Sequence, residues 1–232
     1  MSHQETAHEQ YGTSMTVCDY IVVHQLEEHR PATIVDFGAG AGKNGWLARQ
    51  ALGESVRITA VEGFSKTAAM LAQENTYDQV DGQLIQDWIA TNRERYDLAI
   101  FGDVLEHLTK SEIDRVMAHC LRHFKVIIVI CPLHEIFQDE AYGNELEIHH
   151  TYVTEDFFDG YGYQEKHIVR SGAWVIMNVL IDTRVDPLPF SRRFTWALFH
   201  LVVMLLQPFG LARPLVTLLK KRFLKYKRLL GR

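Results

Sequence analysis

Residues 33–37 (TIVDF) form a short β-branched run, and the glycine-rich sequence GAGAG follows it directly. A helical pattern occupies residues 46–52. Glycine tolerates positive φ and lets the backbone approach a ligand closely. In open α/β sheets, ligands bind beyond the carboxyl ends of the strands. The sequence therefore predicts a strand–turn–helix unit in which Gly38, Gly40 and Gly42 contact a nucleotide-like cofactor.

Strands and helices alternate along most of the chain. Strands are expected at 33–37, 57–61, 83–85, 96–101 and 126–131, and helices at 13–29, 46–52, 65–73 and 109–123, with a short one at 154–158. The last two strands, at 167–170 and 174–181, have little helix between them, so we expect an antiparallel hairpin. The predicted fold class is α/β, a doubly wound, mainly parallel seven-stranded sheet with an antiparallel edge hairpin. Ser65 and a capping box at Thr109 are the expected helix starts.

The glycine-rich turn differs from one phosphate-binding pattern and matches another. A Walker loop requires Ser or Thr after Gly-Lys, but here Asn44 follows Lys43. The dinucleotide pattern GxGxxG does match, although alone it is weak support for a dinucleotide. Its glycines are Gly40, Gly42 and Gly45.

Acidic residues beside the turn favour a cationic ligand that contains adenosine. Asp36 stands two residues before Gly38, where its carboxylate would repel a pyrophosphate and attract an ammonium group. An α-ammonium and a sulfonium are both present in S-adenosylmethionine. Glu62 ends the second strand and can accept hydrogen bonds from ribose hydroxyls. Asp87 can accept from the adenine amino group and Trp88 offers a stacking face; a helix N-cap and a core tryptophan are the alternative for this pair.

Four segments, in this order, resemble the class I S-adenosylmethionine-dependent methyltransferases. They are VDFGAGAG at 35–42, VEG at 61–63, QDW at 86–88 and FGDVLEHL at 101–108, and the resemblance covers roughly residues 11–182. It implies that Asp36 and the glycines hold the methionine moiety and that Glu62 holds the ribose. Asp87 with Trp88 would hold the adenine, and Asp103 would lie beside the methyl group. YGNELEIH at 142–149 with TEDFF at 154–158 is similar to bacterial methyltransferases of glycans and small molecules.

The catalytic residues are expected after the fourth and fifth strands. Methyl transfer to a hydroxyl requires alignment of the acceptor and a base that works near neutral pH, usually histidine. We expect His149 to be the general base, oriented by Glu147 or Glu106, with His107 close to the methyl group. A structural role is the alternative for each histidine. The loop at 133–151 also holds His134 and His150, but its spacing matches no standard ligand pattern, so no metal is predicted.

Charge is distributed unevenly along the chain. The sequence has 24 Lys and Arg and 29 Asp and Glu, and residues 187–232 hold ten of the basic residues and none of the acidic ones. Residues 1–186 therefore carry a formal charge of −15 and residues 187–232 one of +10. An acidic body repels phosphate. In addition, residues 102–105 read GDVL where DNA-base methyltransferases would show an (N/D)PPY-type motif, so nucleic acid is not expected as a partner.

Residues 187–232 are interpreted as a separate tail, which gives predicted domains at 1–186 and 187–232. The uncharged stretch at 194–206 is too short to span a bilayer, which needs about 20 residues. One helical face of the next segment carries Val216, Leu219, Phe223, Tyr226 and Leu230, and basic residues lie mostly off it. This pattern is typical of an amphipathic helix in a membrane surface, so residues 190–232 are predicted to bind an anionic membrane. A protein partner, a homodimer and packing on the body are the alternatives.

Together these features predict a cytoplasmic methyltransferase that is peripherally bound to the inner face of the cell membrane. The polar start MSHQETAHEQ shows no signal peptide, and three cysteines fit reduced, buried thiols. The expected reaction is O-methylation of a hydroxyl on a lipid-linked or membrane-proximal glycan or lipid. Two alternatives stay open. One is a soluble small-molecule N- or O-methyltransferase dimerised by its tail, and the other is a non-catalytic scaffold of the same fold that recruits a membrane enzyme.

Overall fold

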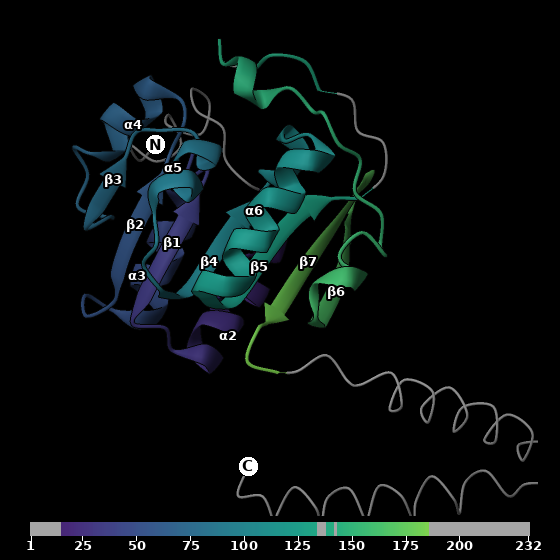
Figure 1. Cartoon of the computed structure of the whole chain (residues 1–232), viewed down its shortest axis with the longest axis horizontal. Coiled ribbons are helices and arrows are strands. Elements are labelled where there is room, and N and C mark those ends of the chain that lie inside the picture. The colour runs from purple at the N-terminus through teal and green to yellow at the C-terminus, as the bar shows by residue number, and fades with distance from the viewer. Residues whose placement is uncertain (1–14, 134–137, 142, 186–232) are drawn as a thin grey trace, which may run out of the picture. The chain divides into compact units, whose positions relative to one another are not determined.

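The computed structural model describes residues 15–133, 138–141 and 143–185, and every structural statement below concerns these residues. Seven strands within them form one mixed sheet in the order β3-β2-β1-β4-β5-β7-β6 (Figure 1). β1 to β5 run parallel, whereas β7 is antiparallel to both β5 and β6. The predicted sheet with its antiparallel edge hairpin is confirmed. The strands are β1 (Thr33–Phe37), β2 (Arg57–Val61), β3 (Gln79–Asp81), β4 (Tyr96–Gly102), β5 (Phe124–Pro132), β6 (Tyr163–Ser171) and β7 (Trp174–Asp182).

Helices cover both faces of the sheet, as a doubly wound fold requires. Leu47 of α3 packs in one buried cluster with Ile34 of β1, and Val116 of α6 packs in another with Val35. Neighbouring residues of β1 thus face opposite cores, because side chains alternate along a strand. The helices are α2 (Asp19–His29), α3 (Lys43–Leu52), α4 (Ser65–Leu71), α5 (Ile85–Thr91) and α6 (Lys110–His123).

The inner strand β5 is apolar on both sides. Val126 and Ile128 belong to the cluster beneath α2 and α3, whereas Ile127 and Val129 belong to the cluster beneath α5 and α6. A parallel strand covered on both faces has no solvent side and therefore no polar alternation. This explains why the run VIIVIC at 126–131 predicts its strand so clearly.

Three local expectations differ from the structure. The third strand is Gln79–Asp81, paired with β2, and not 83–85, because α5 already begins at Ile85. Val80 is the one apolar residue of this short edge strand, so it leaves almost no hydrophobic pattern. Ser65 is the first residue of α4 and does not cap it, and residues 155–158 form turns in place of the expected short helix. The capping box is confirmed, since the Glu112 carboxylate accepts a hydrogen bond from the Thr109 N–H at 2.9 Å.

Several expectations concern residues outside the described part of the chain. These are the polar start, His134 and the whole tail at 187–232, so membrane binding by the tail stays a prediction. Among the described helices, none is long and apolar enough to cross a membrane. Cys18, Cys120 and Cys131 are buried free thiols, as predicted.

Candidate active site

A cavity of about 720 Å³ lies beyond the carboxyl ends of β1, β2 and β4. Small-molecule sites usually have volumes of about 300–1,000 Å³. The glycine loop after β1, the turn after β2, the segment after β4 and the loop before β6 all contribute to its wall. Its lining includes Gly38, Gly40, Lys43, Glu62, Gly63, Leu84, Gln86, Asp103, Glu106, His107, Leu146, Glu147, His149 and His150.

The glycine-rich loop has a backbone that glycine adopts easily and other residues do not. Gly38, Gly40 and Gly42 have φ values of 64°, 52° and 81°, all in the left-handed region. Space is a second constraint at Gly38, where a Cβ would lie 2.6 Å from Cγ2 of Val104. Gly38 and Gly40 line the cavity, whereas Gly42 is the N-cap of α3. The predicted strand–turn–helix unit is therefore present.

Asp36 lies beneath this loop and is not part of the cavity wall. Its side chain is fully buried; Oδ2 accepts a hydrogen bond from the Tyr77 hydroxyl at 2.7 Å, and Oδ1 accepts one from Nδ2 of Asn44 at 3.5 Å. Burial raises the pKa of Asp36 to about 6, although these hydrogen bonds act in the opposite direction. Asp36 thus joins Tyr77 to Asn44 of α3, and its contact with an ammonium group stays a prediction.

Sequence reasoning misses Tyr77, which makes the short hydrogen bond to Asp36. Gly45 permits this contact, because a Cβ there would lie 2.4 Å from Cζ of Tyr77. The third glycine of the GxGxxG match thus leaves room for a tyrosine ring against α3. The two hydrogen-bonded residues are 41 positions apart, so no local pattern connects them.

Glu62 holds the loop from the cavity side. Its Oε2 accepts a hydrogen bond from the Gly40 N–H at 2.9 Å, and Oε1 accepts one from the Phe64 N–H at 2.8 Å. Burial raises the pKa of Glu62, while both hydrogen bonds oppose this shift. A carboxylate has about four lone-pair positions, so about two are left for hydroxyl groups that enter the cavity. Binding of a ribose by Glu62 stays a prediction, which this place in the cavity wall allows.

Asp87 and Trp88 do not line the cavity. Trp88 is 2% exposed, and its ring packs edge-on against Phe37 with centroids 5.2 Å apart. Its Nε1 donates a hydrogen bond to Oδ2 of Asp81 at 2.8 Å. Asp87 is exposed in the first turn of α5. The alternative of a core tryptophan describes Trp88, which lies on α5. Neither residue lines the cavity, so its geometry lends no support to the predicted adenine role.

Near Gly63, two leucine side chains make the cavity wall apolar. Leu84 is 39% exposed and Leu146 is 43% exposed. Both approach Gly63, where a Cβ would lie 2.9 Å from a methyl carbon of each leucine. Gln86 lines the cavity as well. Sequence reasoning misses these residues, since two exposed leucines 62 positions apart become one surface only when the loops fold together.

Asp103 follows β4 with a φ of 52°, in the left-handed region that Asp tolerates better than most residues. Its Oδ2 accepts a hydrogen bond from the Met15 N–H at 2.8 Å. Its Oδ1 is buried and has no hydrogen-bond partner among the described residues. Burial raises the pKa of Asp103 to about 6. The residue lines the cavity, and its predicted position beside the methyl group stays a prediction.

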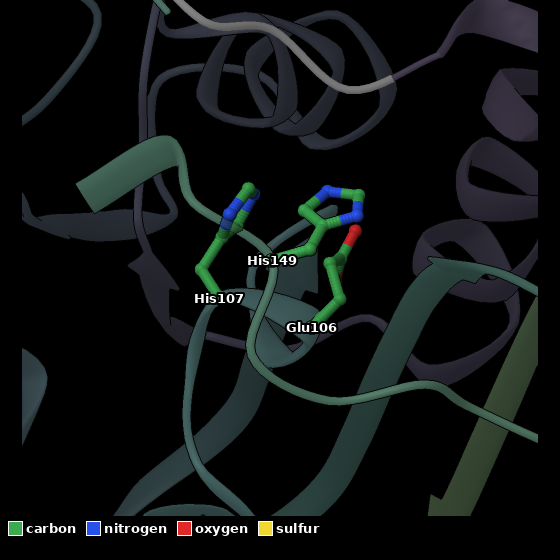
Figure 2. Close-up of side chains that lie close together, drawn as sticks. All are labelled: Glu106, His107 and His149. Carbon is green, nitrogen blue, oxygen red and sulfur yellow. The ribbon is translucent and has the colours of Figure 1, made fainter. Parts of the chain in front are cut away.

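Glu106, His107 and His149 lie close together in the wall of the same cavity (Figure 2). The imidazole centroids of His107 and His149 are 4.8 Å apart. Glu106 is 2% exposed, and its Oε2 lacks a hydrogen-bond partner within the described part of the chain. Burial, with smaller contributions from the Asp103 and Glu147 carboxylates, raises the pKa of Glu106 well above its ordinary value. Burial and the neighbouring His149 lower the pKa of His107 to about 4, so its ring is neutral at pH 7.

Backbone hydrogen bonds bring the loop that carries His149 to the end of β4. The His150 N–H donates to the carbonyl oxygen of Glu106 at 2.8 Å. Glu147 lines the cavity from the same loop, and burial raises its pKa. The three residues predicted to be catalytic, His107, Glu147 and His149, are thus brought into one wall together with Glu106.

Comparison with solved structures shows that the chain has the fold of class I S-adenosylmethionine-dependent methyltransferases, at identities that show the fold alone. TehB from Haemophilus influenzae matches at 12% identity and a TM-score of 0.55, over 70% of this chain and 61% of that one. This chain thus spans under two thirds of TehB. The 1,6-didemethyltoxoflavin-N1-methyltransferase of Burkholderia thailandensis, with 1,6-didemethyltoxoflavin and S-adenosylhomocysteine, matches at 16% identity and a TM-score of 0.53, over 71% and 78%.

The N-terminal domain of EvdMO1, determined in the presence of S-adenosylhomocysteine and D-fucose, matches at 13% identity and a TM-score of 0.51, over 74% of this chain and 84% of that one. No protein-family model matches the sequence. The search of curated proteins finds no match either. The fold implied by the sequence resemblance is therefore confirmed.

Proposed function

We propose that this chain is an S-adenosylmethionine-dependent methyltransferase that methylates a hydroxyl or amino group of a small molecule. One observation carries the proposal. A single cavity is lined by the glycine loop, by Glu62 and by the Glu106, His107 and His149 side chains. Cofactor-binding and proton-transferring groups thus face one space. Solved structures of the same fold that hold S-adenosylhomocysteine support the choice of cofactor.

The described residues fit the parts of S-adenosylmethionine. Glu62 keeps about two lone-pair positions for the ribose hydroxyls. Gly38 and Gly40 leave the backbone of the loop open to the cavity. The unpartnered Oδ1 of Asp103 suits an ammonium group, and the exposed face of Leu84 suits the adenine ring. When bound, S-adenosylmethionine supplies an electrophilic methyl group carried by a sulfonium.

The acceptor is proposed to lie against His107, His149 and Glu147. Methyl transfer is an in-line displacement, so alignment of the acceptor oxygen supplies much of the rate. His107 is neutral at pH 7 because of its low pKa, and it can hold the acceptor hydroxyl by a hydrogen bond. Without a metal ion, His149 takes the hydroxyl proton as general base. Glu106, whose carboxyl group lies within 4.8 Å of a ring nitrogen of His149, orients that imidazole.

Two of the structural neighbours favour a small-molecule acceptor. One was determined with 1,6-didemethyltoxoflavin and another with D-fucose. The second candidate acceptor is a lipid-linked glycan or lipid at the cytoplasmic membrane face. It is favoured by the basic, amphipathic sequence of residues 214–232. A non-catalytic scaffold is the least supported alternative, because such a protein needs no cavity lined by unpartnered carboxylate oxygens.

Titration of S-adenosylhomocysteine into the full-length protein by calorimetry tests the cofactor site. Wild type is expected to bind, and Glu62→Gln is expected to weaken binding about 10- to 100-fold, since hydrogen bonds to a charged group contribute about 1.5–3 kcal/mol. Asp87→Asn is the matched control, because it neutralises an exposed carboxylate outside the cavity wall. Its affinity is expected to equal that of wild type. Absence of binding by wild type, or equal loss in both variants with intact circular dichroism, would contradict the proposal.

A further inference from the structure

We propose that Glu106, His107 and His149 together bind one divalent transition-metal ion, with Zn²⁺ as the test case. One carboxylate and two imidazoles are a ligand set found in mononuclear zinc and iron(II) sites. A site with three protein ligands keeps a position open for water or substrate. The proposal that these side chains bind a metal ion does not depend on the proposed function. The effect of that ion on methyl transfer does depend on it.

The spacing of the three ligands is close to that of a formed site. Each residue offers one ligand atom, and these atoms all lie within 4.8 Å of one another. Figure 2 shows the Glu106 carboxylate next to the His149 ring. With bonds of about 2.1 Å, tetrahedral ligands of Zn²⁺ are about 3.4 Å apart. Small side-chain rotations, of about 1 Å at the ligand atoms, would therefore complete the site.

Glu106 provides a second observation that points to a ligand. The residue is 2% exposed, and its Oε2 has no hydrogen-bond partner in the part of the chain that the structure describes. Burying an unpartnered carboxylate oxygen costs free energy, and a bound cation removes that cost. The Oδ1 of Asp103 is also buried and unpartnered within the same ranges.

The charge around the cluster is negative and has little compensation. The carboxylates of Asp103 and Glu147 both act on Glu106 as like charges. Lys43 is the one lysine or arginine among the described residues that line the cavity. Its ammonium group already pairs with Asp19 at 2.7 Å. A divalent ion supplies the positive charge that these carboxylates lack.

The backbone holds the ligands in place. Glu106 and His107 are consecutive in one 3-10 turn, and the His150 N–H bonds to the Glu106 carbonyl oxygen at 2.8 Å. This bond fixes the neighbour of His149 against the first ligand. Nδ1 of His107 lies 3.4 Å from the carbonyl oxygen of Ile148. An imidazole oriented by a backbone carbonyl through one nitrogen presents the other nitrogen to a metal.

A metal ion in this place changes how a hydroxyl acceptor is activated. A hydroxyl oxygen on a divalent ion loses its proton much nearer to neutral pH than a free one does. The proton passes to solvent, the oxygen lone pair forms the bond to the methyl carbon, and the carbon–sulfur bond breaks with its electron pair left on sulfur. His149 is then a ligand and not the general base, and metal binding decides between the two roles.

The experiment titrates Zn²⁺ alone into full-length protein that has been treated with a chelator. Wild type is expected to bind one equivalent in this cluster. His149→Ala and Glu106→Gln are each expected to weaken that binding at least about 100-fold, more than the loss of an outer partner of a ligand. His24→Ala is the matched control, since the side chain of His24 is 76% exposed on α2, and its affinity is expected to equal that of wild type.

The outcomes separate this proposal from the proposed function. Absence of saturable Zn²⁺ binding, or equal affinity in wild type and His149→Ala, overturns the metal site. His149 lies in a loop, so His149→Ala is expected to fold. This variant therefore tests the metal site even if Glu106→Gln fails to fold. Titration of S-adenosylhomocysteine into the same samples is independent of the metal. Zn²⁺ binding without S-adenosylhomocysteine binding removes the proposed function and retains the metal site, whereas the reverse leaves His149 as the base.

Discussion

The substitution Gly45→Ala tests the packing behind the glycine loop. Gly45 lies inside α3, so helix propensity alone predicts that alanine stabilises the protein by about 1 kcal/mol. The structure predicts the opposite sign. A Cβ at this position would lie 2.4 Å from Cζ and 2.6 Å from both Cε1 and the hydroxyl oxygen of Tyr77. The ring is buried, so it cannot move aside freely.

The size of the effect follows from what Tyr77 would lose. Displacing its hydroxyl breaks the 2.7 Å hydrogen bond to Oδ2 of Asp36. A hydrogen bond to a charged group contributes about 1.5–3 kcal/mol, and overpacking a filled site adds about 1–3 kcal/mol. After subtraction of the gain in helix propensity, Gly45→Ala is expected to lower the free energy of unfolding by about 1.5–5 kcal/mol.

Urea denaturation with linear extrapolation measures this difference. A double-mutant cycle with Tyr77→Ala identifies the cause. Once the ring is absent, Gly45→Ala is expected to be neutral or slightly stabilising. A Gly45→Ala protein as stable as wild type would refute the reasoning, and so would an equal loss in the Tyr77→Ala background.

Two further predictions concern pH and membranes. Asp36 has a pKa of about 6 in place of 3.8, so the stability contributed by its protonated form is complete below about pH 4 and is lost as pH rises through about 6. Between these pH values Asp36→Asn should therefore lose less unfolding free energy than wild type in urea denaturation, and equal losses would contradict the raised pKa. The full-length protein should sediment with anionic vesicles and not with zwitterionic ones. Binding should weaken as salt rises from about 0.1 M to about 1 M, and equal sedimentation with both lipids would contradict a basic membrane-binding tail.

Local features of the fold can be predicted from the sequence because each depends on neighbouring residues. The run at 33–37 with its glycines predicts β1 and the loop, VIIVIC predicts β5, and the spacing of Thr109 and Glu112 predicts a helix start. β3 is missed because a three-residue edge strand with one apolar residue leaves no periodic signal. With the third strand expected at 83–85, Asp87 and Trp88 are predicted to lie in the turn after it, whereas they lie on α5. Their predicted adenine role depends on that expected turn.

The sequence by itself therefore determined most of the strands and helices, though not β3 or α5, together with the glycine loop and Glu62 at the end of β2. Only the tertiary structure decided that Tyr77 reaches Asp36 past Gly45, and that Leu84 and Leu146 share a wall. It alone also joins the pair at 106–107 to His149, which lies 42 residues further along the chain than His107. The physical reason is that such contacts depend on where separate loops close over the sheet. That closure is set by buried packing and hydrogen bonds between distant segments, which no local pattern of residues records.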